Sequence, residues 1–219
     1  MDVERPQTAG AARRLPPGRH GLSRDHVVKS QRERVQDAVV ELVAEKGYLE
    51  TTVQEITKRA GVSKATFYEN FADKEDCFWS ANDTRFLALA LAVNNGYDEG
   101  GDAWPGRLRG GIKALLEFLA AEHAFARVVF IEALAVGESG LARRHLVLTA
   151  LRSYFDPELR PEMNVGVERP NLVAEAVVDS LAGMLFTRIL EHRAQELPDD
   201  LDDFVYVALL PYGGHRALS

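Results

Sequence analysis

The segment Thr51–Glu75 constrains the fold more than any other part of this chain, because it encodes two short helices joined by a tight turn. Thr52 is a suitable N-cap for the first helix. Gly61 stands where that helix must end, since glycine takes the left-handed backbone conformation without a Cβ clash. Ser63 then serves as the N-cap of a second helix of about two turns.

Two helices joined in this way form a helix-turn-helix, a motif that lays its second helix in the major groove of DNA. The outward and flanking positions of the second helix carry mostly short polar side chains, which suit close approach to base edges. We expect the following residues to face the groove: Ser63, Lys64, Ala65, Thr66, Glu69 and Asn70.

A third helix precedes this pair and is expected to pack behind it. Its apolar residues recur at helical spacing and form one stripe: Val35, Ala38, Val39, Leu42 and Val43. A basic residue and a glycine, Lys46 and Gly47, mark its end. Asp73 and Asp76 resemble a capping box that opens a fourth helix. Three helices over so small a core predict a compact head of about 50 residues.

The head resembles the N-terminal domain of the TetR/AcrR transcriptional regulators over about residues 30–81. It departs from the family pattern at Asn70, where His or Tyr is frequent, and at Cys77-Phe78, where a Leu commonly follows the Lys-Glu pair after one residue. The resemblance implies that Thr52, Tyr68 and Lys74 contact phosphate. The matching residues are Thr52-Val53, Ile56, Ala60-Gly61-Val62-Ser63, Thr66-Phe67-Tyr68, Phe71 and Lys74-Glu75.

The charge distribution supports this interpretation better than the net charge of −7 does. Residues 1–76 contain 13 basic and 13 acidic side chains, whereas residues 77–219 contain 13 and 20. The acidity therefore lies in the C-terminal part, and phosphate contacts depend on local cations. The single cysteine, Cys77, excludes an intramolecular disulfide and is expected to be a small buried hydrophobe rather than a redox sensor.

Helical periodicity without strand-like alternation predicts an all-α fold of about nine helices. We divide it into a flexible basic arm (1–25), a helix-turn-helix domain (26–76) and a body for ligand binding and dimerisation (77–219). The arm is rich in Arg, Pro and Gly, and either reaches DNA or is a solvated tail. Asn94-Asn95-Gly96 is expected to end the fourth helix. The later helices are expected at about 107–121, 124–136, 141–155, 171–197 and 199–210.

The predicted helix over 171–197 is apolar on more than one face, so it needs two packing partners. One is the core of its own chain, and we expect the other to be a second subunit. The resemblance implies the same, since the last two helices of the family usually form a four-helix dimer interface. We therefore predict a homodimer through 171–197 and 199–210. The alternative is a buried core helix in a monomer.

The middle helices are candidates for a ligand cavity, because pockets in helical bundles lie between helices. An aromatic stripe is more often core than pocket, so each residue has this alternative interpretation. Arg188 is expected to form an ion pair, for example with Glu132 or Asp179. The lining favours a small, mostly apolar effector. The candidate pocket residues are Trp79, Phe86, Phe118, Phe125, Phe130, Glu132, Tyr154, Met184 and Arg188.

The sequence offers no constellation for catalysis. Gly137-Glu138-Ser139-Gly140 lacks the spacing and context of a nucleophilic serine. The six histidines are scattered without metal-ligand spacing, and no nucleotide-binding loop is present. We expect neither an enzyme nor a cofactor. An apolar run of about 20 residues is missing, so we expect no membrane span and a cytoplasmic location.

These patterns favour a homodimeric regulator of transcription that binds a palindromic operator in double-stranded DNA. The resemblance implies a repressor that a small ligand releases. An activator is an open alternative, because operator position decides between the two. A second alternative is a helical ligand- or protein-binding module without DNA-binding activity, which the acidic Glu69 and the neutral head would favour.

Overall fold

The computed structural model describes residues 24–159 and 167–213, and within them every regular element is helical. The predicted all-α fold is therefore confirmed, whereas the predicted arm lies outside the described residues except for its last two positions. The α-helices are α1 (Arg24–Lys46), α2 (Val53–Ala60), α3 (Lys64–Asn70), α4 (Lys74–Glu99), α5 (Trp104–Ala121), α6 (His123–Phe130), α7 (Glu138–Arg152), α8 (Pro170–Leu190) and α9 (Leu201–Leu209). Short 3₁₀ turns follow four of them: η1 (Glu132–Val136), η2 (Ser153–Phe155), η3 (Ala194–Asp200) and η4 (Leu210–Tyr212).

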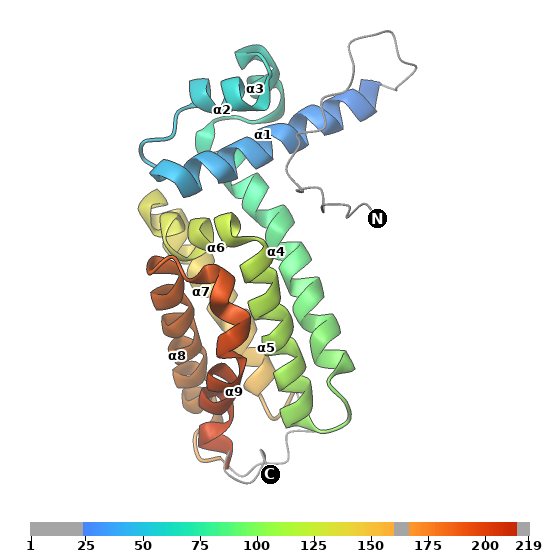
Figure 1. Ribbon diagram of the computed structural model, residues 1–219, viewed down its shortest axis with the longest axis vertical. Coiled ribbons are helices and arrows are strands. Elements are labelled where there is room, and N and C mark those ends of the chain that lie inside the picture. Colours follow the sequence, from blue (N-terminus) through green and yellow to red (C-terminus); the bar gives the residue numbers. More distant parts are fainter. Residues whose placement is uncertain (1–23, 160–166, 214–219) are drawn as a thin grey trace, which may run out of the picture.

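The molecule has a small head and an elongated body (Figure 1). Helices α1 to α3 form the head at one end, with α2 and α3 on the side of α1 away from the body. Helix α4 runs from the head along the length of the body, beside α5. Helices α6 to α9 complete the bundle, and α1 packs against α6 where head and body meet.

Local capping interactions define the helices of the head. The Thr52 hydroxyl accepts the Glu55 N–H at 3.4 Å, and the Glu55 carboxylate accepts the Thr52 N–H at 3.1 Å, which completes a capping box. Gly61 ends α2 in the left-handed conformation with φ 64°. The Ser63 hydroxyl accepts the Thr66 N–H at 3.0 Å and begins α3. These three predicted caps are thus confirmed, and Glu55 adds a hydrogen bond that the sequence analysis did not name. The predicted capping box of α4 forms only in part, because Asp73 accepts the Asp76 N–H but Asp76 accepts the Ala72 N–H.

The core of the head joins all its helices. Its fully or almost fully buried members are Val35, Val39, Val43, Ile56, Phe67 and Phe71. Cys77, at the start of α4, is buried in the same core, and this burial raises the pKa of its thiol to about 12. A thiol in this state is a packing residue, as the sequence analysis expected.

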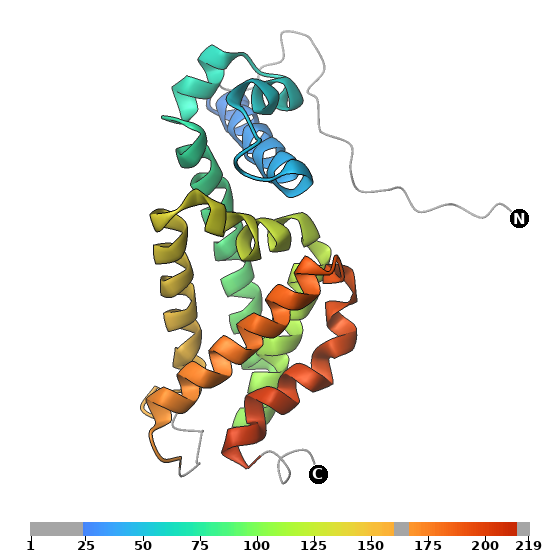
Figure 2. The same ribbon diagram turned by 90° about the vertical axis from the view of Figure 1, so that its left-hand side faces the viewer.

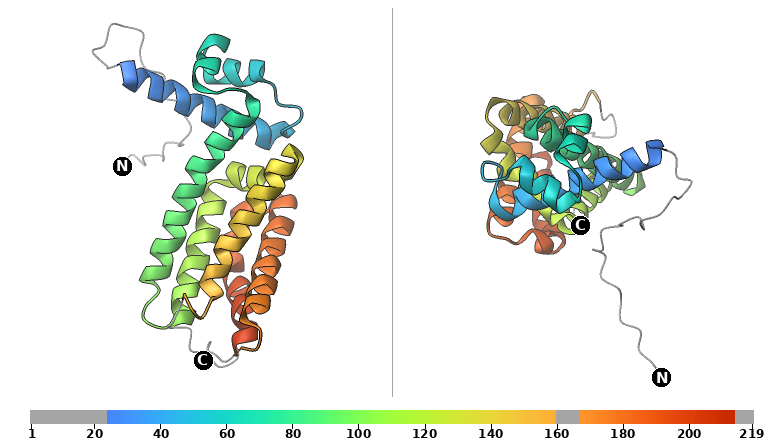
Figure 3. Two further views of the ribbon diagram at one scale, coloured as in Figure 1. Left: turned by 180° about the vertical axis from the view of Figure 1, so that it is seen from behind. Right: turned by 90° about the horizontal axis from the view of Figure 1, so that it is seen from above.

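The prediction that α4 ends near Asn94-Asn95-Gly96 is wrong, because the helix continues to Glu99. Glycines occur there for close packing rather than for a turn. A Cβ at Gly96 would lie 2.6 Å from the carbonyl oxygen of Gly110 on α5, and a Cβ at Gly110 would overlap the carbonyl oxygen of Gly96. The backbones of α4 and α5 therefore touch directly, and the two helices run side by side down to the loop that joins them (Figure 3).

The C-terminal helices also end at other positions than expected. Helix α8 stops at Leu190 instead of reaching residue 197, because the chain turns at His192 with a positive φ of 61°. Leu197 is still fully buried, but it reaches the core from η3. The apolar pattern thus correctly predicted that Leu197 is buried, but it wrongly placed this residue in the same helix as Leu190.

No helix in the described residues is long and apolar enough to cross a membrane. No group of three or more His, Cys, Asp or Glu side chains in the same residues is placed to hold a metal ion.

The contact between α4 and α5 predicts that Gly96→Ala destabilises the protein. The methyl group would force the two backbones apart, and overpacking of this kind costs roughly 1–3 kcal/mol. Thermal or urea unfolding measures the loss. Asn95→Ala, at the neighbouring position of α4, is the matched control, because its side chain is exposed and alanine favours a helix. Equal stabilities of the two variants would contradict the role of the glycine contact.

Candidate functional site

Helix α3, which contains or adjoins the predicted base-reading residues, lies at the outer end of the molecule (Figure 1). Tyr68 is 57% exposed although its ring contacts Phe67 edge-on, with the ring centroids 5.3 Å apart. Thr66 and Asn70 are half-buried. The remaining predicted residues on this surface are exposed: Thr52, Ser63, Lys64, Ala65 and Glu69. The exposed residues are mostly polar, as the reading of base edges in a groove requires.

The C-terminal end of α3 is held by an arginine that the sequence analysis did not identify. Arg32 of α1 donates to the Asn70 carbonyl oxygen at 2.8 Å and to the Ser80 hydroxyl at 2.6 Å. Its guanidinium also lies 4.5 Å from the centre of the Phe71 ring. A cation at the carbonyl end of a helix complements the helix dipole. Helix α3 is therefore held by Ser63 at its first residue and by Arg32 at its last.

The side chain of Asn70 is used within its own helix, because its amide donates to the Thr66 carbonyl oxygen at 2.8 Å. A contact from Asn70 to a base would require this bond to be shared or broken. That Asn70 and Thr66 face the groove therefore stays a prediction.

The two polar residues expected at phosphates besides Tyr68 also have partners within the head. The Thr52 hydroxyl donates to the Glu55 carboxylate at 2.7 Å. The Lys74 ammonium donates to the Tyr48 carbonyl oxygen at 2.8 Å and lies 4.1 Å from the centre of the Tyr48 ring. Burial lowers the pKa of Lys74. Phosphate contacts by these residues stay predictions, and Lys74 also has a structural role.

Two cations of the head are held in ion pairs with carboxylates of the head itself. Arg59 forms a bidentate pair with Glu45 of α1 at 2.5 and 2.7 Å. Lys46 pairs with Glu55 at 2.6 Å. Lys64, by contrast, is exposed at the first residue of α3. This arrangement makes Lys64 the best placed side chain on α3 for an electrostatic contact with DNA.

The residues predicted to line a ligand pocket do not form a single cluster. Phe86, Phe118 and Phe125 meet in the bundle, with ring centroids 5.4 and 6.2 Å from Phe125. Trp79 lies nearer the head and donates to Glu75 at 3.2 Å. Tyr154 lies toward the far end and donates to Asn94 at 2.8 Å.

The other pocket candidates have partners or pack on the core. Phe130 and Met184 are half-buried against the core. Arg188 pairs with Asp200 at 2.6 Å, and not with Glu132 or Asp179 as suggested from the sequence. Glu132 directs its carboxylate toward the head. Which of these residues touch an effector stays a prediction.

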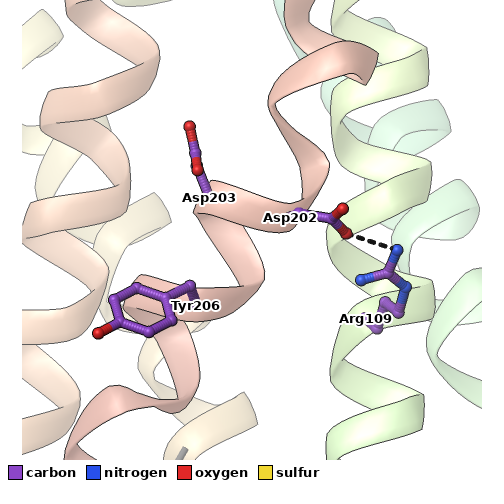
Figure 4. Close-up of a pocket in the computed structure, with 4 residues that line it drawn as sticks. All are labelled: Arg109, Asp202, Asp203 and Tyr206. Carbon is purple, nitrogen blue, oxygen red and sulfur yellow. Dashed lines mark ion pairs between the residues drawn. The ribbon is translucent and has the colours of Figure 1, made fainter. Parts of the chain in front are cut away.

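Two hollows on the described surface lie elsewhere. One, of about 520 Å³, is lined by Arg109 of α5 and by residues of α9. Figure 4 shows Asp202 turned toward Arg109, at 2.7 Å, while Asp203 points away from this pair and Tyr206 lies one turn along α9. The other, of about 560 Å³, is bordered by α1, α6 and the end of α8, and its lining includes Glu45, Arg127 and His192. The predicted pocket residues line neither of the two.

Comparison with known proteins finds a family model that matches most of the head. Residues 36–81 match the family model described as bacterial regulatory proteins, tetR family. The fatty acid metabolism regulator protein of Bacillus subtilis (strain 168) is 29% identical over 123 residues, which are 56% of this chain and 61% of that protein. The curated relatives that the chain matches are each covered over 61% of their length or less.

Solved structures extend the likeness of fold to the body. The fatty acid degradation regulator FadR from Bacillus halodurans has a TM-score of 0.70 at 20% identity, covering 83% of this chain and 94% of that one. FadR from Bacillus subtilis in complex with stearoyl-CoA has a TM-score of 0.67 at 21% identity, covering 82% and 97%. At these identities the comparison establishes the arrangement of helices.

The capping box of α2 predicts a specific dependence of stability on pH. Hydrogen bonds from Lys46 and then from Thr52 lower the pKa of Glu55 from 4.5 to about 2. The folded state therefore favours the charged carboxylate, and this contribution is complete above pH 4.5 and is lost as the pH falls toward 2. Urea unfolding should show that wild type exceeds Glu55→Gln in stability at pH 6 and that the difference shrinks by pH 3. A difference that stays constant with pH would refute this.

Proposed function

We propose that the protein is a sequence-specific DNA-binding regulator of transcription, because residues 36–81 match the family model described as bacterial regulatory proteins, tetR family. The observation that carries this proposal is the position of α3, whose exposed polar surface projects from the end of the molecule and whose two ends are held by Ser63 and Arg32. A helix fixed in this way loses little conformational freedom when it enters the major groove.

The proposed regulator acts as a homodimer through α8 and α9, which are neighbours in the body (Figure 2). One face of α8 is exposed along its whole length and consists mainly of small or apolar side chains. We name it the α8 face: Leu172, Ala176, Ser180, Gly183, Thr187 and Leu190. Small residues allow two helices to approach closely. Tyr206 of α9 and Leu210 of η4 are also exposed. Two heads are needed because one short recognition helix reads too few bases.

The proposed regulation is release from DNA by a small effector, which makes the protein a repressor. An acyl-CoA thioester is the first effector to test. FadR of Bacillus subtilis, which shares this fold, was solved with stearoyl-CoA bound. A long acyl chain also agrees with the mostly apolar effector that the aromatic residues of the body favour, among them Phe86, Phe118 and Phe125.

A gel-shift or fluorescence-anisotropy titration with the DNA upstream of its own gene tests the proposed function. We expect specific binding at low salt that weakens when an acyl-CoA is added. Absence of binding with and without effector would favour the alternative, a helical binding module without DNA-binding activity. The position of the bound site relative to the promoter then separates a repressor from an activator.

Lys64→Met should weaken binding to every DNA sequence by roughly threefold to tenfold and reduce the dependence of affinity on salt. The substitution keeps the length of the side chain and removes one cation from each subunit of the dimer, so the slope of log K against log salt should fall by about 1.8. Lys113→Met is the matched control, because Lys113 is exposed on α5 in the body. An unchanged slope for Lys64→Met would contradict a phosphate contact at this position.

Gly183→Glu should convert the dimer into a monomer that still folds. A side chain at Gly183 meets nothing within 4 Å in the single chain, but in the proposed dimer it would place two carboxylates in the interface. Light scattering after size exclusion measures the mass, and circular dichroism checks the fold. Ala142→Glu, at an exposed position of α7, is the control. A dimer that survives Gly183→Glu would place the interface elsewhere.

A further inference from the structure

Glu132 is a carboxylate of the body that reaches into the head. It is the first residue of η1, directly after α6, and its side chain is only 13% exposed. Its Oε2 atom accepts the backbone N–H of Tyr48, in the turn between α1 and α2, at 3.1 Å. The two residues are 84 positions apart in the sequence, so this bond joins two domains rather than one local motif.

The turn that receives Glu132 is shaped for a close approach. Gly47 has a positive φ of 91°, and a Cβ there would lie 3.1 Å from Glu132 Oε2. Glycine at this position therefore both relieves backbone strain and makes room for the carboxylate. Arg127, one turn earlier on α6, lies 3.6 Å from the other carboxylate oxygen and balances its charge. A largely buried carboxylate with a directed donor and a counter-ion makes a defined interaction.

Tyr48 connects the turn that Glu132 contacts to α4. Its carbonyl oxygen accepts a hydrogen bond from the ammonium of Lys74, the first residue of α4, at 2.8 Å. Its ring lies 4.1 Å from the same ammonium and packs edge-on against Phe78, with centroids 5.0 Å apart. A continuous path of polar contacts thus runs from Arg127 through Glu132 and Tyr48 to Lys74, the residue that starts the helix after α3.

We propose that Glu132 is a positioning residue that sets the orientation of the DNA-binding head relative to the body. The ion pair that crosses this junction in the described residues, between Arg85 and Asp37, involves an exposed carboxylate. Exposed pairs constrain geometry weakly, because solvent competes for both partners. Glu132 differs because it binds a backbone N–H in a sheltered turn and therefore fixes the turn itself.

The consequence for DNA binding rests on the proposed function. Two heads of a dimer must lie about 34–36 Å apart to reach successive major grooves, so a small rotation of each head changes the match to both half-sites. Glu132 would then set affinity without touching DNA. It would also link the region around α6 in the body to the head.

Hydrogen exchange of the full-length chain tests the contact without DNA. Glu132→Ala removes the acceptor, and we expect the Tyr48 amide to exchange at least tenfold faster, while core amides of α1 such as Val39 keep their rates. Glu132→Gln keeps an acceptor and should fall between wild type and Glu132→Ala. Glu138→Ala, at the exposed first residue of α7, is the matched control. An unchanged Tyr48 rate in Glu132→Ala overturns the proposal.

A distance measurement separates positioning from general destabilisation. Spin labels at Lys58→Cys in the head and Lys113→Cys in the body, in a Cys77→Ser background, report the orientation of the head. Dilution of the labelled chain with unlabelled chain keeps the measured distances within one chain. We expect Glu132→Ala to shift or broaden the distribution at temperatures where circular dichroism shows a folded protein, and Glu132→Gln to restore it in part. An identical distribution in Glu132→Ala and wild type overturns the proposal.

A DNA titration tests the consequence for binding. It also distinguishes a failure of the positioning role of Glu132 from a failure of the proposed function. If wild type binds its operator, Glu132→Ala should weaken specific binding at least tenfold, and Glu138→Ala should not. Full affinity in Glu132→Ala would overturn the positioning role. If wild type binds no DNA, the proposed function fails, and hydrogen exchange and the label distances still decide whether Glu132 orients the head.

Discussion

The direct backbone contact between α4 and α5 is the constraint on which the arrangement of the molecule depends. Gly96 on α4 and Gly110 on α5 bring the two helices closer than any side chain would permit. Interiors are close-packed, so a contact without side chains fixes the relative position of two helices strongly. Because α4 also carries the head at its other end, the place where it is held in the body determines where the head can lie.

The N-terminal end of α4, beside the head, is held mainly by polar contacts. Arg32 and Ser80 join α1, the end of α3 and α4, and Tyr48 joins the turn after α1 to Lys74. These hydrogen bonds are directional, so they define the orientation of α3. The buried aromatic side chains of Phe67 and Phe71 stabilise the head through the hydrophobic effect. The molecule thus combines a rigid contact at one end of α4 with a set of specific hydrogen bonds at the other.

Some parts of the candidate site were open to prediction because their causes are local. Thr52, Gly61 and Ser63 act within one helical turn of their own positions, so their roles follow from residue type and spacing. Arg32 and Glu132 could not be found in this way. Their partners are 38 and 84 residues distant, and nothing in the neighbouring sequence distinguishes them from solvated surface charges.

The sequence by itself determined the all-α fold, the helix-turn-helix and most of the residues that α3 exposes, because helical period and capping chemistry act over a few residues. Only the tertiary structure decided what the glycines near residue 96 do and where Glu132 points. From the sequence, Gly96 was expected to end α4, yet in the folded chain it lies inside α4 and allows close packing against α5. The local sequence around Gly96 contains no information about α5. The same physical reason applies to Glu132: a carboxylate acquires its role from the backbone N–H that folding brings to it.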